Sequence, residues 1–380
     1  MASAAPYDGS AVPADAAVRR ARELARDVIA LSVPGWEQER TYPRQVAAES
    51  GLTGLFSPVA DGGLDLSFPD GMRVFEELGR ADAAFAFSLS MHNAVASAIA
   101  RSGGEIAGRW GRSLVAGEAL GGFSLTEPHA GSDATAITTR AAPDGDSYRV
   151  TGRKAWVTLA GTADVFLVVC KTADEPGHRD IAIAVVARDA PGVSFGAPYA
   201  TACARYLRIG EMELDGAPAA LLAPPGAGMR AALGAIDVAR CDIAAIACGL
   251  HAQALDIAVD HARSRMAFGK PLIDLQGVAF ALADSATELE ASRLLVQRAA
   301  ECMGTDGGSV AVAHAKRFAP DAALRGAITA SEALGAYGWL DDHPLARFIT
   351  LAKMLQVVDG TAEIQRVVIA RDLSRRSPRG

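Results

Sequence analysis

The chain has 380 residues, of which half are apolar and 21% are charged, and its formal net charge at pH 7 is -7. This composition is typical of a globular protein with two or three domains and excludes general disorder. The acidic balance, the lack of any Lys/Arg run longer than two residues and an aromatic content of 6% argue against a nucleic-acid-binding surface.

The cysteines and the N-terminus indicate the compartment. The five cysteines form no C-x-x-C pair, and we expect them to be reduced and mostly buried: Cys170, Cys203, Cys241, Cys248 and Cys302. Residues 1–15 lack the basic and apolar regions of a signal peptide, and we expect a disordered tail there. No apolar run approaches the ~20 residues that cross a bilayer. The sequence therefore predicts a cytoplasmic protein without a membrane partner, and we expect no bound metal.

The first third of the chain has helical periodicity. Residues 15–31 carry apolar side chains at helical spacing with charges on the other face, and Pro34-Gly35 is expected to end this helix. Further helices are predicted over 42–50, 69–79, 82–99 and 105–115. His92 falls on a buried-looking helix, where we expect core packing with a hydrogen-bonded histidine. Residues 1–121 are therefore expected to form an N-terminal helical domain.

The pattern changes over residues 122–225. Short apolar or alternating runs are separated by Gly, Pro and Asp turns, which is typical of a compact β domain. The predicted strands are 148–150, 155–159, 165–171, 181–186, 193–195 and 212–214. Residues 226–380 are again helical. Alanine-rich amphipathic runs over 238–264, 276–302, 310–334 and 344–358 are long enough for a four-helix bundle.

One loop between these regions stands out, residues 121–133, Gly-Gly-Phe-Ser-Leu-Thr-Glu-Pro-His-Ala-Gly-Ser-Asp. Glu127-Pro128 requires an extended or turn conformation. The loop offers backbone N–H groups and the hydroxyls of Thr126 and Ser132 with little bulk. It can hold a polar ligand at a sheet edge, and a loop that only connects two domains is the alternative that the residues alone leave open. No G-x-G-x-x-G or Walker motif supports a Rossmann or P-loop site.

Residues 126–133 closely resemble the T-E-P-x-A-G-S-D flavin-binding signature of the acyl-CoA dehydrogenase family. Similar segments recur in family order at 152–161, 237–276 and 356–371, so the resemblance covers nearly all of the chain. It implies an α+β fold with an N-terminal helical domain, a middle β-barrel or sandwich domain and a C-terminal four-helix bundle. It also implies an FAD flavoprotein, assembled as a homodimer or homotetramer, that oxidises acyl thioesters between Cα and Cβ.

The resemblance implies a role for each matched position. Residues expected to bind FAD are Phe123, Leu125, Thr126, Ser132, Trp156, Thr158, Arg265, Phe268, Gln276, Thr361 and Glu363, of which Arg265, Phe268 and Gln276 reach the cofactor of a neighbouring subunit. Residues expected to contact the acyl thioester are Ser132, Asp237, Arg240 and Gly360. Without the resemblance, Trp156 reads as an ordinary core aromatic, Arg265 as a helix C-terminal charge, and Asp237 with Arg240 as a surface ion pair.

The resemblance places the catalytic base at Asp359, where most family members carry the glutamate of Glu-Gly-Thr. A carboxylate there removes the substrate α-proton while a hydride leaves the β-carbon for FAD. Aspartate is shorter by one methylene, about 1.5 Å of reach. A misplacement of that size costs ~100-fold in rate unless the backbone or the substrate compensates. Val238 and Ala239 stand near the family's other position for the base, and neither side chain can accept a proton.

Several readings stay open. Glu332, Ala336 and Thr350-Leu351 depart from the family pattern and indicate a divergent branch. Either CoA or an acyl-carrier protein can present the acyl group, and either an electron-transferring flavoprotein or oxygen can accept the electrons. A nitroalkane-oxidase-like enzyme or a flavin monooxygenase is an alternative on the same fold, and a flavin-bound scaffold with little turnover is a third. The pair Asp237 and Arg240 favours a thioester substrate.

Overall fold

The computed structural model describes residues 14–173 and 179–375. Most of the expected N-terminal tail, residues 1–13, lies outside the described residues. The chain divides into two compact units. The first contains the residues up to 20 together with 34–67 and 88–238, and the second contains 21–33, 68–87 and the residues from 239 onwards. The division into three domains at residues 121 and 225 stays a prediction.

Helices come first along the chain, as predicted. They are α1 (Ala14–Leu24), a π-helical turn (Ala25–Ile29), α2 (Ala30–Glu39), α3 (Arg44–Glu49), α4 (Phe68–Ala81), α5 (Ala83–Ala100) and α6 (Gly104–Val115). The predicted helix end at Pro34-Gly35 is wrong, because α2 continues through both residues. Pro34 lies inside a continuous helical run, where its missing N–H removes one intrahelical hydrogen bond without ending the helix, and a π-helical turn directly precedes α2.

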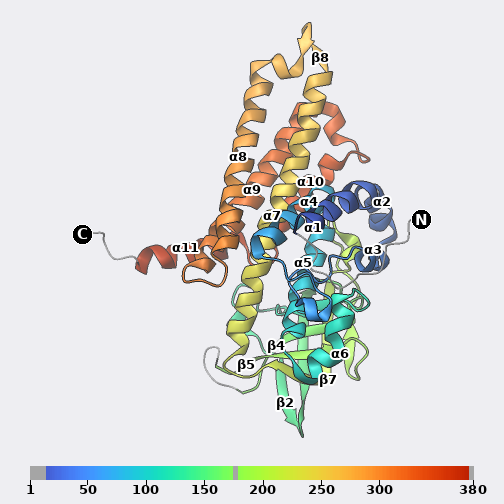
Figure 1. Ribbon diagram of the computed structural model, residues 1–380, viewed down its shortest axis with the longest axis vertical. Helices are drawn as coiled ribbons and strands as arrows, with labels where there is room; N and C mark the ends of the chain where they lie inside the picture. Colours follow the sequence, from blue (N-terminus) through green and yellow to red (C-terminus); the bar gives the residue numbers. More distant parts are fainter. Residues whose placement is uncertain (1–13, 174–178, 376–380) are drawn as a thin grey trace. The chain divides into compact units, whose positions relative to one another are not determined.

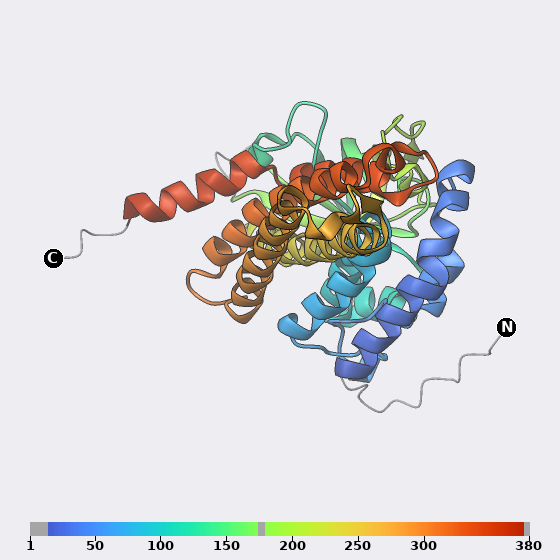
Figure 2. The ribbon, with the colours of Figure 1, turned by 90° about the horizontal axis from the view of Figure 1, so that it is seen from above.

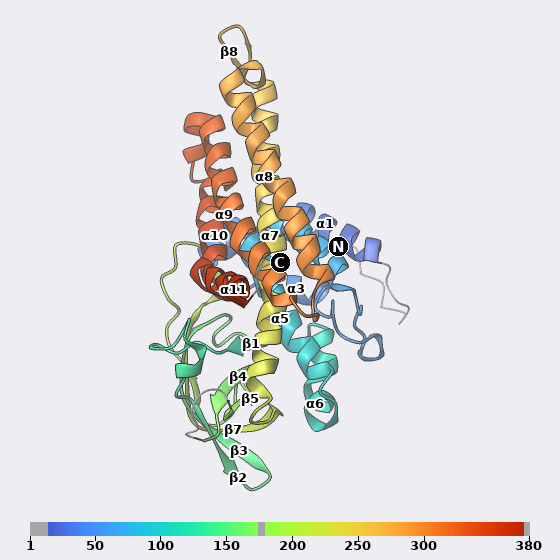
Figure 3. The ribbon, with the colours of Figure 1, turned by 90° about the vertical axis from the view of Figure 1, so that its left-hand side faces the viewer.

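A sheet that closes into a barrel follows, within the first unit. Its seven strands are β1 (Gly121–Ser124), β2 (Arg140–Asp144), β3 (Ser147–Val157), β4 (Val165–Lys171), β5 (Ile181–Ala187), β6 (Val193–Phe195) and β7 (Gly210–Ala223). The order β4-β2-β3-β7-β5 returns to β4, with β1 added parallel to β4 and β6 antiparallel to β7. Strands β2 and β3 form a hairpin (Figure 3). The predicted bounds of β4 and β6 are confirmed, whereas β1 and β2 were not predicted.

Buried side chains from strands and helices form the core of this unit. Val165, Leu167 and Val169 alternate along β4 and all face this core. They pack in one cluster with Val95 and Ile99 of α5. The continuous apolar run that marked 165–171 as a strand matches a strand that is buried on both faces.

His92 of α5 links two further elements. Its Nδ1 accepts a hydrogen bond from the Gly121 N–H (3.1 Å), so Nε2 carries the proton and donates to the Leu114 carbonyl (3.0 Å). The side chain is completely buried, and burial lowers the pKa of His92 to about 4. The expected hydrogen-bonded core histidine is confirmed, and it ties the end of α6 to the start of β1.

Helix α5 is also apolar enough, by length and composition, to cross a membrane. Buried residues make up 83% of its apolar stretch, as in the core helix of a globular protein. The expectation that no run approaches this length is too strict, because the scattered Ser, His and Asn residues of α5 leave its mean hydropathy high.

Helices return after the barrel. They are α7 (Gly228–Ser264), α8 (Gln276–Glu301), α9 (Gly308–Leu334), α10 (Pro344–Val357) and α11 (Ala362–Arg375). A short hairpin of β8 (Met266–Ala267) and β9 (Lys270–Pro271) joins α7 to α8 at the far end of both helices from α11 (Figure 1). In Figure 2, α11 points away from the other helices of the second unit. Within this unit α4 crosses α7 closely, because a Cβ on Gly249 would overlap the Glu76 carbonyl oxygen.

We expect His92→Leu to lower the free energy of unfolding by about 2 to 4 kcal/mol, because it leaves the buried Leu114 carbonyl and Gly121 N–H without a hydrogen-bond partner. His92 is neutral in the folded state and becomes protonated in the unfolded chain below about pH 6.5. The wild type therefore loses this contribution as the pH falls from 6.5 towards 4. Denaturant unfolding should show the largest difference between variant and wild type above pH 6.5, and a difference that stays constant down to pH 4 would contradict this account.

Candidate functional site

The loop after β1 is a tight turn. Glu127 and Ala130 exchange backbone hydrogen bonds of 2.9 and 3.1 Å. Asp133 Oδ1 then accepts the N–H (3.3 Å) and the hydroxyl (2.7 Å) of Thr135. Ser132, between these two turns, is exposed. The predicted turn is confirmed, and local hydrogen bonds leave little freedom at either end of it.

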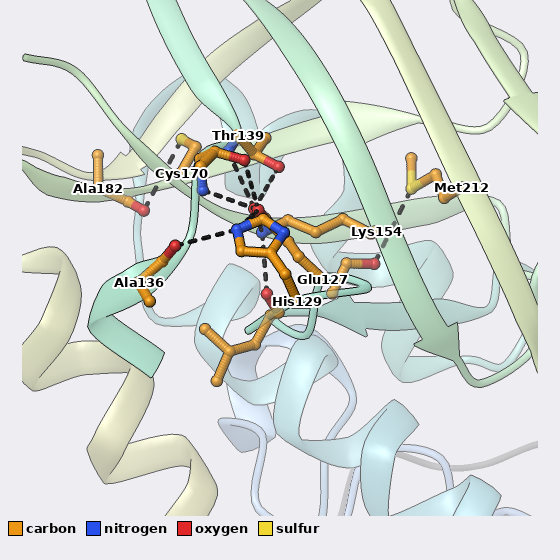
Figure 4. Close-up of polar contacts among 11 residues, drawn as sticks. Glu127, His129, Ala136, Thr139, Lys154, Cys170, Ala182 and Met212 are labelled. Atoms are coloured by element: carbon orange, nitrogen blue, oxygen red, sulfur yellow. Dashed lines mark hydrogen bonds and ion pairs between the residues drawn. The ribbon is translucent and has the colours of Figure 1, made fainter. Parts of the chain in front are cut away.

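Glu127 holds this loop from inside the first unit (Figure 4). Its buried carboxylate accepts from Lys154 Nζ (2.8 Å) and from the N–H and hydroxyl groups of Thr138 and Thr139 (2.6–2.9 Å). Lys154 is equally buried and also donates to the Leu125 carbonyl (2.9 Å). Burial alone would raise the pKa of Glu127, but the Lys154 charge and these hydrogen bonds outweigh it and lower the pKa to about 2. Glu127 is therefore a permanently ionised structural residue.

Trp156 lies beside this loop at the end of β3. The Ala155 N–H donates to the Thr126 carbonyl at 2.9 Å, which places Trp156 and Thr126 next to each other. Trp156 has a left-handed φ of 59°, uncommon for a bulky residue, and is 61% exposed. The Tyr199 ring packs against it with 4.5 Å between centroids. The alternative that Trp156 is an ordinary core aromatic is wrong.

The other predicted cofactor residues of this unit lie on the same strands and loop. Phe123 and Leu125 are partly buried and pack against the core of the unit. Thr126 is partly buried and Thr158 is buried. Apolar side chains, an exposed indole and two hydroxyls are therefore found on and beside the loop that follows β1.

Asp359 lies in the segment between α10 and α11. Asp359 and Gly360 both have left-handed backbones, with φ of 52° and 102°. Arg240 Nε donates to the Asp359 carbonyl (2.9 Å), and the buried Gln365 donates through Nε2 to the Gly360 carbonyl (3.1 Å). A Cβ on Gly360 would stand 2.9 Å from Arg240 Nη2. The left-handed conformation therefore requires glycine at position 360, and a side chain there would also displace the Arg240 guanidinium.

The carboxyl group of Asp359 has an unusual environment. The residue as a whole is partly exposed, but its Oδ2 is buried and has no hydrogen-bond partner among the residues that the structure describes. Burial raises the pKa of Asp359 to about 6, against the opposing charges of Lys316 and Arg240. Lys316 is 2% exposed, and burial lowers its pKa to about 7 against the opposing charge of Asp359. A carboxyl group that titrates near neutral pH is suited to proton transfer.

The two predicted thioester contacts on α7 differ in burial. Arg240 is buried, whereas Asp237, one turn earlier, is partly exposed. Arg240 is therefore not a surface residue, and it contacts the backbone of Asp359. Thr361 and Glu363 follow at the start of α11, where the exposed Glu363 pairs with Arg366 (3.0 Å). Hydrogen bonds from its own N–H and from Thr361 lower the pKa of Glu363.

The remaining predicted cofactor residues lie at the other end of α7. Phe268 stands at the tip of the β8–β9 hairpin, with a left-handed φ of 50°, and is 93% exposed. Arg265 and Gln276 flank the hairpin and are also exposed. The stretch of α7 from Arg240 to its last residue spans about 36 Å at 1.5 Å per residue. The structure therefore groups these three residues with one another, and not with Asp359.

Sequence analysis missed the buried polar residues that hold these segments. Glu127 and Lys154 stood within recognised motifs, but only the barrel brings them together. Gln365 and Lys316 gave a weaker signal, a polar side chain at a position where helical periodicity would place an apolar one.

The chain is similar to known proteins over nearly its whole length. Models of the acyl-CoA dehydrogenase N-terminal, middle and C-terminal domains match residues 14–118, 122–217 and 226–374. An acyl-CoA dehydrogenase of Bacillus subtilis is 35% identical over 362 residues, which cover 93% of this chain and 95% of that protein. The chain belongs to the acyl-CoA dehydrogenase family. The predicted fold class, helical, then β, then helical, is confirmed with it.

Solved structures of this family share the fold. The butyryl-CoA dehydrogenase of Megasphaera elsdenii matches with a TM-score of 0.90 at 30% identity, covering 99% of this chain and 100% of that one. A chain in the structure of the electron transferring flavoprotein of Acidaminococcus fermentans matches with a TM-score of 0.91 at 29% identity, with the same coverage. The prolyl acyl carrier protein oxidase AnaB, with a TM-score of 0.89 over 95% of this chain and 98% of its own, is 24% identical, which shows the fold alone.

FAD is the cofactor of the acyl-CoA dehydrogenase family, as the motif predicted. A glutaryl-CoA dehydrogenase of Mycobacterium smegmatis has been solved with FADH2, at 24% identity and a TM-score of 0.88, over 97% of this chain and 96% of that one. The residues of the first unit fit such a group. The exposed, strained Trp156 offers an aromatic face, and Thr126 and Thr158 offer hydroxyls for the polar edge of a ring.

We expect Glu127→Gln to destabilise the protein by about 3 to 5 kcal/mol, because it leaves the Lys154 charge buried without its partner. The variant should also retain less FAD, since the loop that carries Thr126 loses its anchor. Thermal unfolding and the flavin absorbance of the purified protein measure the two effects.

Two controls accompany this prediction. The double variant Glu127→Gln/Lys154→Met should regain part of the stability, and the exposed Glu105→Gln should change little. The folded-state pKa of Glu127 is depressed, so the ion pair contributes above the unfolded pKa of about 4.5 and is lost as the pH falls towards 2. A single variant as stable as the wild type at pH 7 would contradict the assigned role.

Proposed function

We propose that this chain is an FAD-dependent dehydrogenase of an acyl thioester, with Asp359 as the base that removes the α-proton. The observation that carries the proposal is the buried Asp359 Oδ2, which has no protein partner among the described residues although Arg240 fixes the backbone of the same residue. A carboxylate held in this way keeps a lone pair for a proton of the substrate.

The environment of Asp359 supports this role. Burial removes water from the carboxylate, which makes it a stronger base than an exposed aspartate while it remains largely ionised at neutral pH. The α-proton becomes acidic when the negative charge that develops on the thioester carbonyl is stabilised, and a backbone N–H of the Gly360–Thr361 segment can supply one such hydrogen bond.

The aspartate that stands in place of the usual glutamate has an unusual backbone conformation. Asp359 has a left-handed φ of 52°, a conformation that aspartate adopts more readily than most residues. The side chain is shorter by about 1.5 Å. The proposal therefore requires that the substrate Cα approach the backbone of Asp359 more closely than it would a glutamate.

Other residues would hold the ligands. When bound, FAD would supply the acceptor for the hydride, a proton with two electrons, that leaves Cβ. We assign its ring to Phe123, Leu125, Thr126, Trp156 and Thr158, and its polar remainder to Ser132, Thr361 and Glu363. Ser132, Asp237, Arg240 and Gly360 are assigned to the thioester and its pantetheine arm.

The hairpin residues support a shared cofactor. A guanidinium such as that of Arg265 suits a diphosphate, because its planar fork donates two charge-assisted hydrogen bonds. The separation of about 36 Å along α7 keeps Arg265 away from the base of its own chain. We therefore propose a homo-oligomer in which Arg265, Phe268 and Gln276 contact the FAD of a neighbouring subunit.

CoA is the proposed carrier of the acyl group, and an electron-transferring flavoprotein is the proposed acceptor. The likeness to butyryl-CoA dehydrogenase and to the electron transferring flavoprotein structure supports them. An acyl-carrier protein can present the same pantetheine arm. Aspartate at position 359 favours a nitroalkane-oxidase-like reaction as the second candidate, and Arg240 beside the base favours the thioester.

We expect Asp359→Asn to slow reduction of the flavin by an acyl-CoA about 10²- to 10⁴-fold, because the variant has no base. Anaerobic titration with acyl-CoAs of different lengths measures the bleaching of the oxidised flavin band. Asp359→Glu keeps the carboxylate and should stay within ~100-fold of the wild type. An asparagine variant reduced at the wild-type rate would rule out Asp359 as the base. A wild-type flavin that carrier-bound acyl groups or nitroalkanes bleach, and acyl-CoAs do not, would favour the alternatives.

We expect mixed oligomers of Asp359→Asn and Arg265→Ala subunits to recover activity that neither variant has alone. If Arg265 serves the neighbouring subunit, one site of a mixed dimer carries both defects and the other carries none. If Arg265 serves its own subunit, every site is defective and no activity returns. Coexpression with two different affinity tags isolates the mixed species.

A further inference from the structure

Lys316 lies on the buried face of α9, where most of the other buried residues are alanines, and is 2% exposed. Its Nζ donates a 2.6 Å hydrogen bond to the carbonyl oxygen of Leu355. Leu355 belongs to the last turn of α10, which ends at Val357, and carbonyl groups there lack an intrahelical partner. The lysine therefore satisfies a helix terminus from a neighbouring helix, and its positive charge complements the negative end of the α10 dipole.

A second contact from α9 reaches the next residue of α10. Gln356 Nε2 donates to Asp321 Oδ1 (2.8 Å), and Asp321 is itself paired with Arg317. Leu355 and Gln356 are thus both held by α9, and Asp359 follows three residues later. The end of α10 is the fixed support from which the Asp359 segment projects.

The charges around Asp359 come from two helices. Lys316 of α9 and Arg240 of α7 both favour its ionised form, and Asp321 of α9 favours the charged form of Lys316. Arg240 directs its Nε to the Asp359 carbonyl, which fixes the backbone. A buried ammonium costs much free energy unless an opposite charge accompanies it. Two carboxylates offset that cost for Lys316, of which Asp359 has the larger effect and Asp321 the smaller.

We propose that Lys316 is a positioning residue for the base: it fixes the end of α10 through Leu355 and holds a positive charge that stabilises ionised Asp359. This inference rests on the proposed role of Asp359. It adds a residue that does not touch the substrate and that determines how the base is placed and in which pH range it is ionised.

The sign of the pH effect follows from the charges. Burial raises the pKa of Asp359 to about 6, and the Lys316 charge opposes that rise. Removal of the charge therefore raises the pKa further, and the acid limb of kcat/KM moves to higher pH. An opposite charge at close range shifts a carboxyl pKa by about one unit or more. We expect kcat/KM at pH 6 to fall about tenfold, with recovery to within about twofold of the wild type at pH 9.

Three substitutions separate the two parts of the role. Lys316→Gln keeps a hydrogen-bond donor for Leu355 but removes the charge, so it should shift the acid limb while FAD content and Tm stay near the wild type. Lys316→Met removes both, and should lower kcat at every pH besides shifting the limb. Lys316→Arg keeps both and should retain the wild-type profile. The exposed Lys353→Met on α10 is the control for loss of a lysine: it removes one exposed hydrogen bond to Gln356 Oε1 (2.8 Å) and leaves the bond from Gln356 Nε2 to Asp321 in place.

A direct titration provides a readout that does not depend on turnover. ¹³C NMR of protein labelled at the aspartate carboxyls reports the ionisation of Asp359, identified as the signal that Asp359→Asn removes. The Asp359 midpoint should rise in Lys316→Gln and stay unchanged in Lys353→Met. If the midpoint of the Asp359 titration is unchanged in Lys316→Gln, the inference is overturned. This test does not depend on whether Lys316→Met folds. If Asp359→Asn turns over normally, the proposed function fails, whereas the titration still tests Lys316 alone.

Discussion

A carboxylate taken out of water must find charges and N–H or O–H donors in the protein, or its pKa rises. Among the carboxylates with buried oxygens in the described part of the chain, Glu127 and Asp359 reach opposite outcomes. Glu127 receives an ammonium and a full set of hydrogen bonds, so it stays ionised far below neutral pH. Asp359 keeps an oxygen without a protein partner in the described part of the chain and titrates near neutral pH. The first group builds the loop, and the second is available for chemistry.

The two carboxylates also show how structural support is separated from reactivity. A buried lysine favours the ionised form of each carboxylate, but the two lysines make different contacts. Lys154 forms a direct ion pair with Glu127, and both side chains are almost inaccessible. Lys316 donates a hydrogen bond to the carbonyl end of α10 and acts on Asp359 through its charge. A direct ion pair at Asp359 would occupy the lone pair that the proposed reaction needs.

Part of this arrangement could be predicted from the sequence. The bounds of β4 could be predicted because a buried strand is continuously apolar, and those of β6 because Val-Ser-Phe alternates between apolar and polar. Strand β2 was not predicted, because Arg-Ala-Ala-Pro-Asp is neither continuously nor alternately apolar and pairs with β3 through its backbone. The prediction at Pro34 was wrong because an internal proline weakens a helix but does not always end it. Asp359 was found by resemblance alone. The contacts of Lys316 and Glu127 join distant segments, and no local pattern encodes them.

Arg240 and Gly360 lie close together, but different constraints act on them. A Cβ at position 360 would stand 2.9 Å from Arg240 Nη2, and the φ of 102° disfavours a side chain there whichever residue occupies position 240. The backbone therefore keeps glycine at position 360, whereas the arginine is kept only by what its guanidinium contacts. During divergence the arginine can change first, and the glycine should persist in relatives that have lost it.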